Sequence, residues 1–181
     1  MIAALIIGCE IAFWVFVLAG LVARYLIGWK KTGAVLLAST PVVDVVLIAV
    51  TIIDLRNGAT AELVHGLAAV YIGVTVAFGH RIIKWADGHF AYRFAKGTKP
   101  AAKPKHGKAH ARMEREGWYR HLLAWGLGSL LLLFMIWIVG DADRTQQLAD
   151  MALWWGAVVV IDFVISFSYT IWPKRSGQQQ V

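Results

Sequence analysis

Residues 119–140 read YRHLLAWGLGSLLLLFMIWIVG, and this stretch determines the class of the fold. After Arg120 and His121 it contains no ionisable side chain. An α-helix rises about 1.5 Å per residue, so about twenty apolar residues cross the hydrocarbon core of a bilayer, which is roughly 30 Å thick. The stretch therefore predicts a transmembrane helix.

Four further stretches have the same length and character. They cover residues 3–28, 33–55, 61–83 and 148–172. Pro41 falls inside the second one, where it removes a backbone hydrogen bond that neighbouring groups in a membrane protein can replace. The sequence thus predicts an all-α, polytopic membrane protein with five transmembrane helices, forming a single transmembrane domain over residues 1–181.

The composition is not that of a soluble domain. Of the 181 residues 59% are hydrophobic, and the mean hydropathy is +0.61, whereas about half is apolar in soluble domains. Cys9 is the single cysteine, so neither a disulfide framework nor a thiolate metal cage is expected. No HExxH, GxSxG, P-loop or dinucleotide-binding motif is present. Nothing in the sequence therefore supports an enzyme, a metal site or a cofactor.

The net charge of +7 is distributed unevenly along the chain. Of the 18 Lys and Arg residues, all but Arg56 and Arg144 lie around the connections after the first and third helices or at the end of the fifth. The positive-inside rule assigns this side to the cytoplasm. The sequence therefore predicts an N-terminus outside the cytoplasm and a C-terminus inside it.

The long connection over residues 84–118 is predicted to be a cytoplasmic basic loop. Residues 81–95 (RIIKWADGHFAYRFA) carry an apolar stripe, which predicts an amphipathic helix at the membrane interface. Residues 97–111 (GTKPAAKPKHGKAHA) are rich in Lys, Pro, Ala and Gly, which is typical of a linker. No folded basic platform is recognisable, so the expected partners are the bilayer and its anionic lipid headgroups rather than nucleic acid.

Tryptophan and basic side chains cluster at the predicted boundary on the basic side. Amphipathic rings and long cationic side chains favour the headgroup region. The residues expected at this lipid interface are Lys84, Trp85, Arg93, Trp118 and Trp172.

Four ionisable residues lie well inside the predicted spans. They are Glu10 and His65 in the outer third of the membrane, and Asp44 and Asp162 nearer its middle. A charged side chain at the centre of a span costs about 2.5–3.5 kcal/mol on insertion scales, so each of the four needs a partner or a function. They are the candidate residues of an ion or proton pathway.

His65 begins a row of small residues on the third helix. Ala69, Gly73 and Ala77 follow it at four-residue spacing, which lets another helix backbone approach closely. His65 is therefore expected to face protein rather than lipid, and Glu10 is an attractive partner because the two lie at equal depth.

Three functions are compatible with this pattern. In the first, a structural or accessory membrane component uses neutral acids and a neutral imidazole to hold its helices together. In the second, Asp44 and Asp162 translocate protons or cations; five helices are few for this task, which favours a homodimer or a membrane-protein partner. The third is a b-type haem protein, for which only His80 and His121 are placed to approach each other, and no CxxCH motif supports it.

Several short motifs resemble a known group of proteins. TPVVD (residues 40–44), GATA (residues 58–61) followed by His65-Gly66, and SYTIWPK (residues 168–174) are similar to a family of small integral membrane proteins from actinobacteria and bacilli that is uncharacterised. The resemblance covers most of the chain. It implies a five-helix protein of the bacterial plasma membrane and supplies no activity or catalytic residue.

Overall fold

The fold is known from a computed structural model that describes residues 2–94, 98–102 and 104–173. The described residues form α1 (Ile2–Tyr25), α2 (Lys30–Arg56), α3 (Leu63–Phe94), α4 (Gly107–Val139) and α5 (Ala142–Ile171). Each of these five helices is long and apolar enough to cross a membrane. The prediction of an all-helical protein with five membrane-spanning helices is confirmed.

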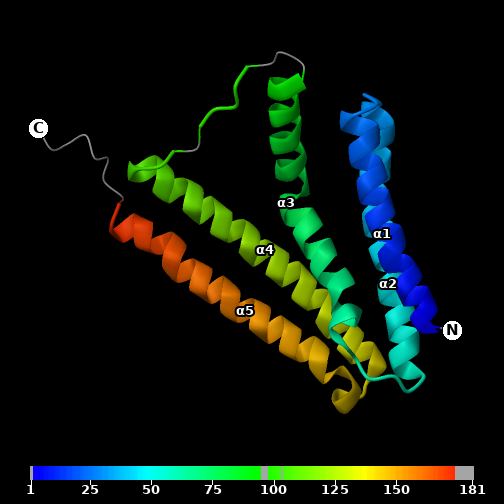
Figure 1. Cartoon of the computed structure of the whole chain (residues 1–181). Helices are drawn as coiled ribbons and strands as arrows, with labels where there is room; N and C mark the ends of the chain where they lie inside the picture. The colour runs from blue at the N-terminus through cyan, green and yellow to red at the C-terminus, as the bar shows by residue number, and fades with distance from the viewer. Residues whose placement is uncertain (1, 95–97, 103, 174–181) are drawn as a thin grey trace, which may run out of the picture.

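The helices are arranged as two hairpins with α3 between them (Figure 1). α1 pairs with α2 and α4 pairs with α5, while α3 contacts both α2 and α4. The helices converge at the end that holds the α2–α3 and α4–α5 connections, and α3 and α4 diverge toward the other end (Figure 1). We call the converging end, with Asp54, Glu62, Asp141 and Asp143, the acidic end, and the end with the α1–α2 and α3–α4 connections the basic end.

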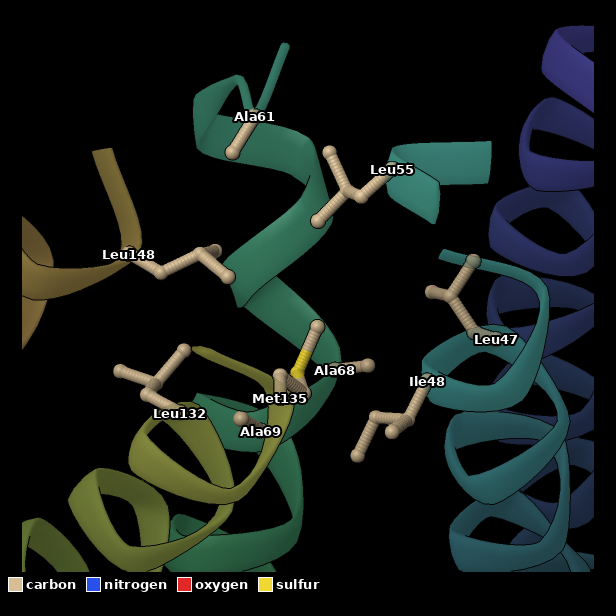
Figure 2. Close-up of a cluster of buried hydrophobic side chains, with 9 residues drawn as sticks. All are labelled: Leu47, Ile48, Leu55, Ala61, Ala68, Ala69, Leu132, Met135 and Leu148. Atoms are coloured by element: carbon tan, nitrogen blue, oxygen red, sulfur yellow. The ribbon is translucent and has the colours of Figure 1, made fainter. Parts of the chain in front are cut away.

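The hydrophobic core lies at the acidic end, where four helices meet. Figure 2 shows side chains from α2, α3, α4 and α5, together with Ala61 of the α2–α3 connection, pointing into one cluster. Its members are Leu47, Ile48, Leu55, Ala61, Ala68, Ala69, Leu132, Met135 and Leu148. The backbone N–H of Ala61 also donates to the carbonyl of Arg144 over 2.7 Å, which ties the α2–α3 connection to α5.

Glycines allow two of the helix pairs to approach backbone to backbone. A Cβ on Gly33 of α2 would lie 2.5 Å from the Cβ of Arg24 on α1. A Cβ on Gly73 of α3 would lie 2.4 Å from the carbonyl oxygen of Ala124 on α4. Real Cβ atoms do not come this close to other heavy atoms, so glycine is required at both positions.

The proline inside α2 is accommodated by its neighbour in the sequence. Because Pro41 has no N–H, the carbonyl of Leu37 loses its usual helical donor. The hydroxyl of Thr40 donates to that carbonyl over 2.9 Å. This local replacement lets α2 continue from Lys30 to Arg56.

An ion pair joins α1 to α3 at the basic end. The guanidinium of Arg24 donates to both carboxylate oxygens of Asp87, over 3.0 Å from Nε and 2.6 Å from Nη2. The ring of Tyr25 packs on that of Phe90 with centroids 5.1 Å apart. These contacts fix the basic end of α1 against α3.

The helices extend further than the predicted spans on the basic side. The amphipathic segment is helical and continuous with α3 as far as Phe94, and α4 already begins at Gly107 instead of Tyr119. Residues 84–94 are helical as predicted for the amphipathic segment, whereas residues 107–118, predicted to belong to a loop, are helical as well. The reason is that hydropathy reports the thickness of the membrane, whereas a helix continues into water wherever its residues favour it.

Candidate functional site

A groove opens where α3 and α4 diverge, and it is the candidate functional site. Its volume is about 370 Å³, which falls in the range of small-molecule sites. Seven of its eight lining residues carry no ionisable group. Three helices line the groove with Val74, Phe78, Ile82, His121, Ala124, Trp155, Val158 and Val159.

The shape of the groove follows from the sizes of the side chains around it. At Gly73 the backbones of α3 and α4 touch, because neither Gly73 nor Ala124 has a large side chain. Toward the basic end, the rings of Phe78 and His121 lie between the two helices with centroids 5.1 Å apart. Two aromatic rings between the helices keep α3 and α4 further apart than the direct backbone contact at Gly73 does. A groove therefore forms on the basic side of Gly73.

A hydrogen-bonded polar pair forms one wall of this groove. His121 Nδ1 of α4 lies 2.5 Å from the Asp162 carboxylate of α5, and Ser166 Oγ lies 3.3 Å from the other carboxylate oxygen. When Asp162 is ionised and the imidazole is neutral, Nδ1 is the donor and Nε2 is left as an acceptor, because a carboxylate only accepts hydrogen bonds. His121 is half-exposed, with 49% of its side chain accessible, whereas Asp162 is 26% accessible. His121 can therefore contact a ligand in the groove, while Asp162 fixes the position of its ring.

Two tryptophans hold α4 against α5 on either side of this pair. The indole N–H of Trp118 donates to the carbonyl of Val159 over 3.0 Å, and that of Trp125 donates to the carbonyl of Ala152 over 2.9 Å. The Trp118 ring also packs edge-on against Phe163. The α4–α5 hairpin is thus a well-connected unit that presents His121 from a defined position.

A second polar group lies at the acidic end. The backbone N–H of Glu62 donates to Nδ1 of His65 over 2.8 Å, so the neutral imidazole carries its proton on Nε2. Nε2 lies 3.8 Å from the carboxylate of Asp54. His65 is 6% exposed, so it faces protein. Its carboxylate neighbour in the described part of the chain is Asp54; the side chain of Glu10 lies outside that part.

Asp44 belongs to a different part of the protein from Asp162. It is 1% exposed and lies on the buried stripe of α2 between Thr40 and Thr51. α2 packs mainly on α1 and α3, whereas α5 packs mainly on α4. Asp44 and Asp162 therefore lie on helices whose main packing partners differ.

The remaining predicted residues are distributed as follows. Ala69, Gly73 and Ala77 are buried on the face of α3 that meets α4. The predicted interface residues lie on the basic half of the molecule: Lys84, Trp85, Arg93 and Trp172 are exposed, and Trp118 is partly buried against α5. Among the described residues, no group of three His, Cys, Asp or Glu side chains is placed to hold a metal ion.

From the sequence, His121 was considered together with His80 as a haem ligand, and its pairing with Asp162 was not predicted. A signal was available, because the two residues lie almost equally far along the chain from the turn at Gly140, where α4 ends with a left-handed backbone. In an antiparallel hairpin, residues equidistant from the turn lie at the same level. Their rotation toward each other about the helix axes was not available from the sequence.

These features define a polytopic α-helical membrane protein with an apolar groove and a polar pair in its wall. The chain is 45% identical over 175 residues to the uncharacterised membrane protein YmcC of Bacillus subtilis strain 168; the match covers 96% of this chain and 94% of that protein. The chain belongs to the family of this membrane protein. No family model matches the chain, and no solved structure matches it.

Proposed function

We propose that the protein binds an amphipathic molecule from the bilayer in the groove between α3, α4 and α5. The observation that carries this proposal is the His121–Asp162 pair in an otherwise apolar wall. Apolar sites with a few placed polar groups are typical of small-molecule binding. The rim residues Ile82 and Val158 are 55% and 60% exposed, so in a membrane a ligand can enter sideways from the lipid.

His121 is the residue proposed to contact the polar part of the ligand. With Nδ1 donating to Asp162, Nε2 can accept a hydrogen bond from a hydroxyl or amine of the ligand.

The orientation is part of the proposal. We propose that the basic end faces the cytoplasm, with the N-terminus outside, because nearly all Lys and Arg residues gather at this end. The bacterial plasma membrane is the compartment that fits the relative from Bacillus subtilis.

A structural or accessory role is the second candidate, and the same hydrogen bond favours it. His121 and Asp162 connect α4 to α5, as do Trp118 and Trp125. Interhelical hydrogen bonds in membranes contribute about 0.6 kcal/mol on average, so loss of this one alone lowers stability only slightly. A proton or cation pathway through Asp44 and Asp162 has less support, because the two lie on helices whose main packing partners differ.

Photocrosslinking tests the proposal. A benzoylphenylalanine replaces Phe78 in the groove or, as a control, Trp137, which is 77% exposed on α4. After irradiation of membranes, mass spectrometry identifies the adducts. We expect one discrete adduct at position 78 and bulk lipid at position 137. Adducts of the same composition at both positions would contradict a binding site.

Two variants separate binding from structure. Asp162→Asn and His121→Phe are expected to reduce the adduct at position 78 while the thermal unfolding temperature stays close to that of the wild type. The structural role predicts an unchanged adduct at position 78 in both variants. Because the hydrogen bond contributes only about 0.6 kcal/mol, the adduct and not the unfolding temperature separates the two roles.

A further inference from the structure

The groove continues toward the basic end into a second, more open cavity. This cavity has a volume of about 230 Å³ and is lined by Phe78, Arg81, Ile82 and Trp85. Phe78 and Ile82 also line the first groove. The two cavities therefore form one continuous surface, apolar along most of its length and cationic at the end where Arg81 lies.

Arg81 extends the row of small residues on α3. It follows the buried Ala77 by four residues, as Ala77 follows Gly73. Residues at this spacing share a face of the helix, which here is the face toward α4. In the part of the chain that the structure describes, Arg81 makes no ion pair and no side-chain hydrogen bond.

Arg120 takes the matching position on α4. It precedes Ala124 by four residues, and Ala124 is the residue that Gly73 contacts. Its Nε atom is buried and has no hydrogen-bond partner among the described residues. A buried guanidinium N–H without an acceptor is costly, so the surroundings of Arg120 favour an anion.

Three other arginines of the basic half already have partners, whereas Arg93 is exposed and has none among the described residues. Arg24 pairs with Asp87, Arg112 with Glu116, and Arg115 donates to Thr170. Arg81 and Arg120 differ from these three because neither has such a partner within the described ranges. Arg81 thus lies at the basic mouth of the apolar groove, and Arg120 precedes His121, which lines the groove from α4.

We propose that the ligand of the groove is an anionic phospholipid, with its phosphate bound by Arg81 and Arg120 and an acyl chain along Phe78 and Ile82. This proposal rests on the proposed function of the groove. Guanidinium groups match the geometry of phosphate oxygens, which accept paired hydrogen bonds. The charge selects an anionic headgroup, and the apolar wall selects a lipid over a soluble phosphate. Trp85, which is 57% exposed beside Arg81, is suited to the headgroup level.

Lipid retention measured by native mass spectrometry tests this proposal. The full-length protein is purified in detergent, mixed with equal amounts of phosphatidylglycerol and phosphatidylcholine, and the bound copies are counted. The wild type is expected to retain phosphatidylglycerol preferentially. Loss of both charges in Arg81→Gln/Arg120→Gln is expected to weaken this retention about thirty-fold, from roughly fivefold per arginine.

Arg112→Gln is the matched control. It removes the same charge from the same helix, but Arg112 is 77% exposed and paired with Glu116. Its retention of phosphatidylglycerol is expected to equal that of the wild type. Arg81→Lys/Arg120→Lys keeps the charge but not the paired hydrogen bonds, and is expected to bind more phosphatidylglycerol than the double Gln variant and less than the wild type, which excludes misfolding as the cause. Inorganic phosphate at millimolar concentration is expected to displace nothing.

Three results would overturn the lipid assignment. The first is equal loss of phosphatidylglycerol in Arg112→Gln and the double Gln variant, and the second is displacement by inorganic phosphate alone. The third is a discrete adduct at position 78 that contains no phosphate, which leaves the groove as a binding site but removes its proposed ligand class. Absence of any discrete adduct at position 78 in the wild type refutes the proposed function itself, and the lipid site with it.

Discussion

Replacing Gly73 by alanine tests the packing that creates the groove. The added Cβ would lie 2.4 Å from the carbonyl oxygen of Ala124 and 3.1 Å from the backbone nitrogen of Gly128. Ordinary van der Waals contact begins at 3.4 Å, so α3 and α4 must separate by about 1 Å at this level. Both contacts are backbone atoms, so no side-chain rotamer can relieve the clash.

Two opposing effects determine the size of the change in stability. Alanine favours the helix over glycine by about 0.5–1 kcal/mol. Overpacking of a close contact costs about 1–3 kcal/mol, and a rigid backbone partner places Gly73→Ala near the upper end. The net loss in the free energy of unfolding is therefore about 2 kcal/mol. For a protein of this length that corresponds to a fall in Tm of about 4–8 °C.

Gly79→Ala on the same helix is the control. The nearest atom to its added Cβ is Cγ2 of Thr75 at 3.6 Å, so this variant changes helix propensity without a clash. Tm is measured for both variants from tryptophan fluorescence in one detergent. Gly79→Ala should match or exceed the wild type, while Gly73→Ala should fall clearly below it. A Gly73→Ala protein as stable as Gly79→Ala would refute the close approach of α3 and α4.

Three further predictions concern the ends of the helices. Arg24→Gln breaks the ion pair between α1 and α3 and should lower the free energy of unfolding by about 1 kcal/mol in a detergent unfolding assay; equal stability would mean that the pair contributes nothing. In a Cys9→Ser background, a membrane-impermeant maleimide should label Asn57→Cys in intact cells but Lys105→Cys only after permeabilisation, and the opposite pattern would invert the proposed orientation. His65→Phe leaves the N–H of residue 62 without its acceptor and should cost about 1–3 kcal/mol, measured as a lower Tm; an unchanged Tm would contradict the role of this hydrogen bond.

The sequence predicted the helices well because lipid imposes one simple requirement on each. About twenty apolar residues must be consecutive, and this can be read without knowing what each residue touches. The beginning of α4 was missed for the opposite reason. Residues 107–118 are polar, but they include good helix formers and ion pairs at four-residue spacing, His110 with Glu114 and Arg112 with Glu116. These local interactions continue the helix beyond the membrane, where hydropathy carries no signal.

The polar residues could be located in depth but not paired. Depth follows from position along a helix, so His65 and Asp162 were recognised as costly. The partner depends on how each helix is rotated and tilted, which the packing of all neighbours decides. His65 meets Asp54 because both lie near the short α2–α3 connection, and Asp162 meets His121 across the α4–α5 hairpin. In both cases the partner comes from the adjacent helix in the sequence, and this suggests a rule for similar chains.

The V shape of the molecule follows from a gradient of side-chain size along α3. Near the acidic end Ala68, Ala69 and Gly73 bring its backbone against neighbouring helices. Toward the basic end, α3 carries the large side chains of Phe78 and Trp85. Small residues let two helices approach closely, and large residues keep them further apart, because side chains at a helix interface are packed in contact. Because the large residues of α3 lie toward the basic end, the groove opens on the side where Arg81 lies. The same feature that leaves His121 accessible therefore also makes the groove reachable from the headgroup region.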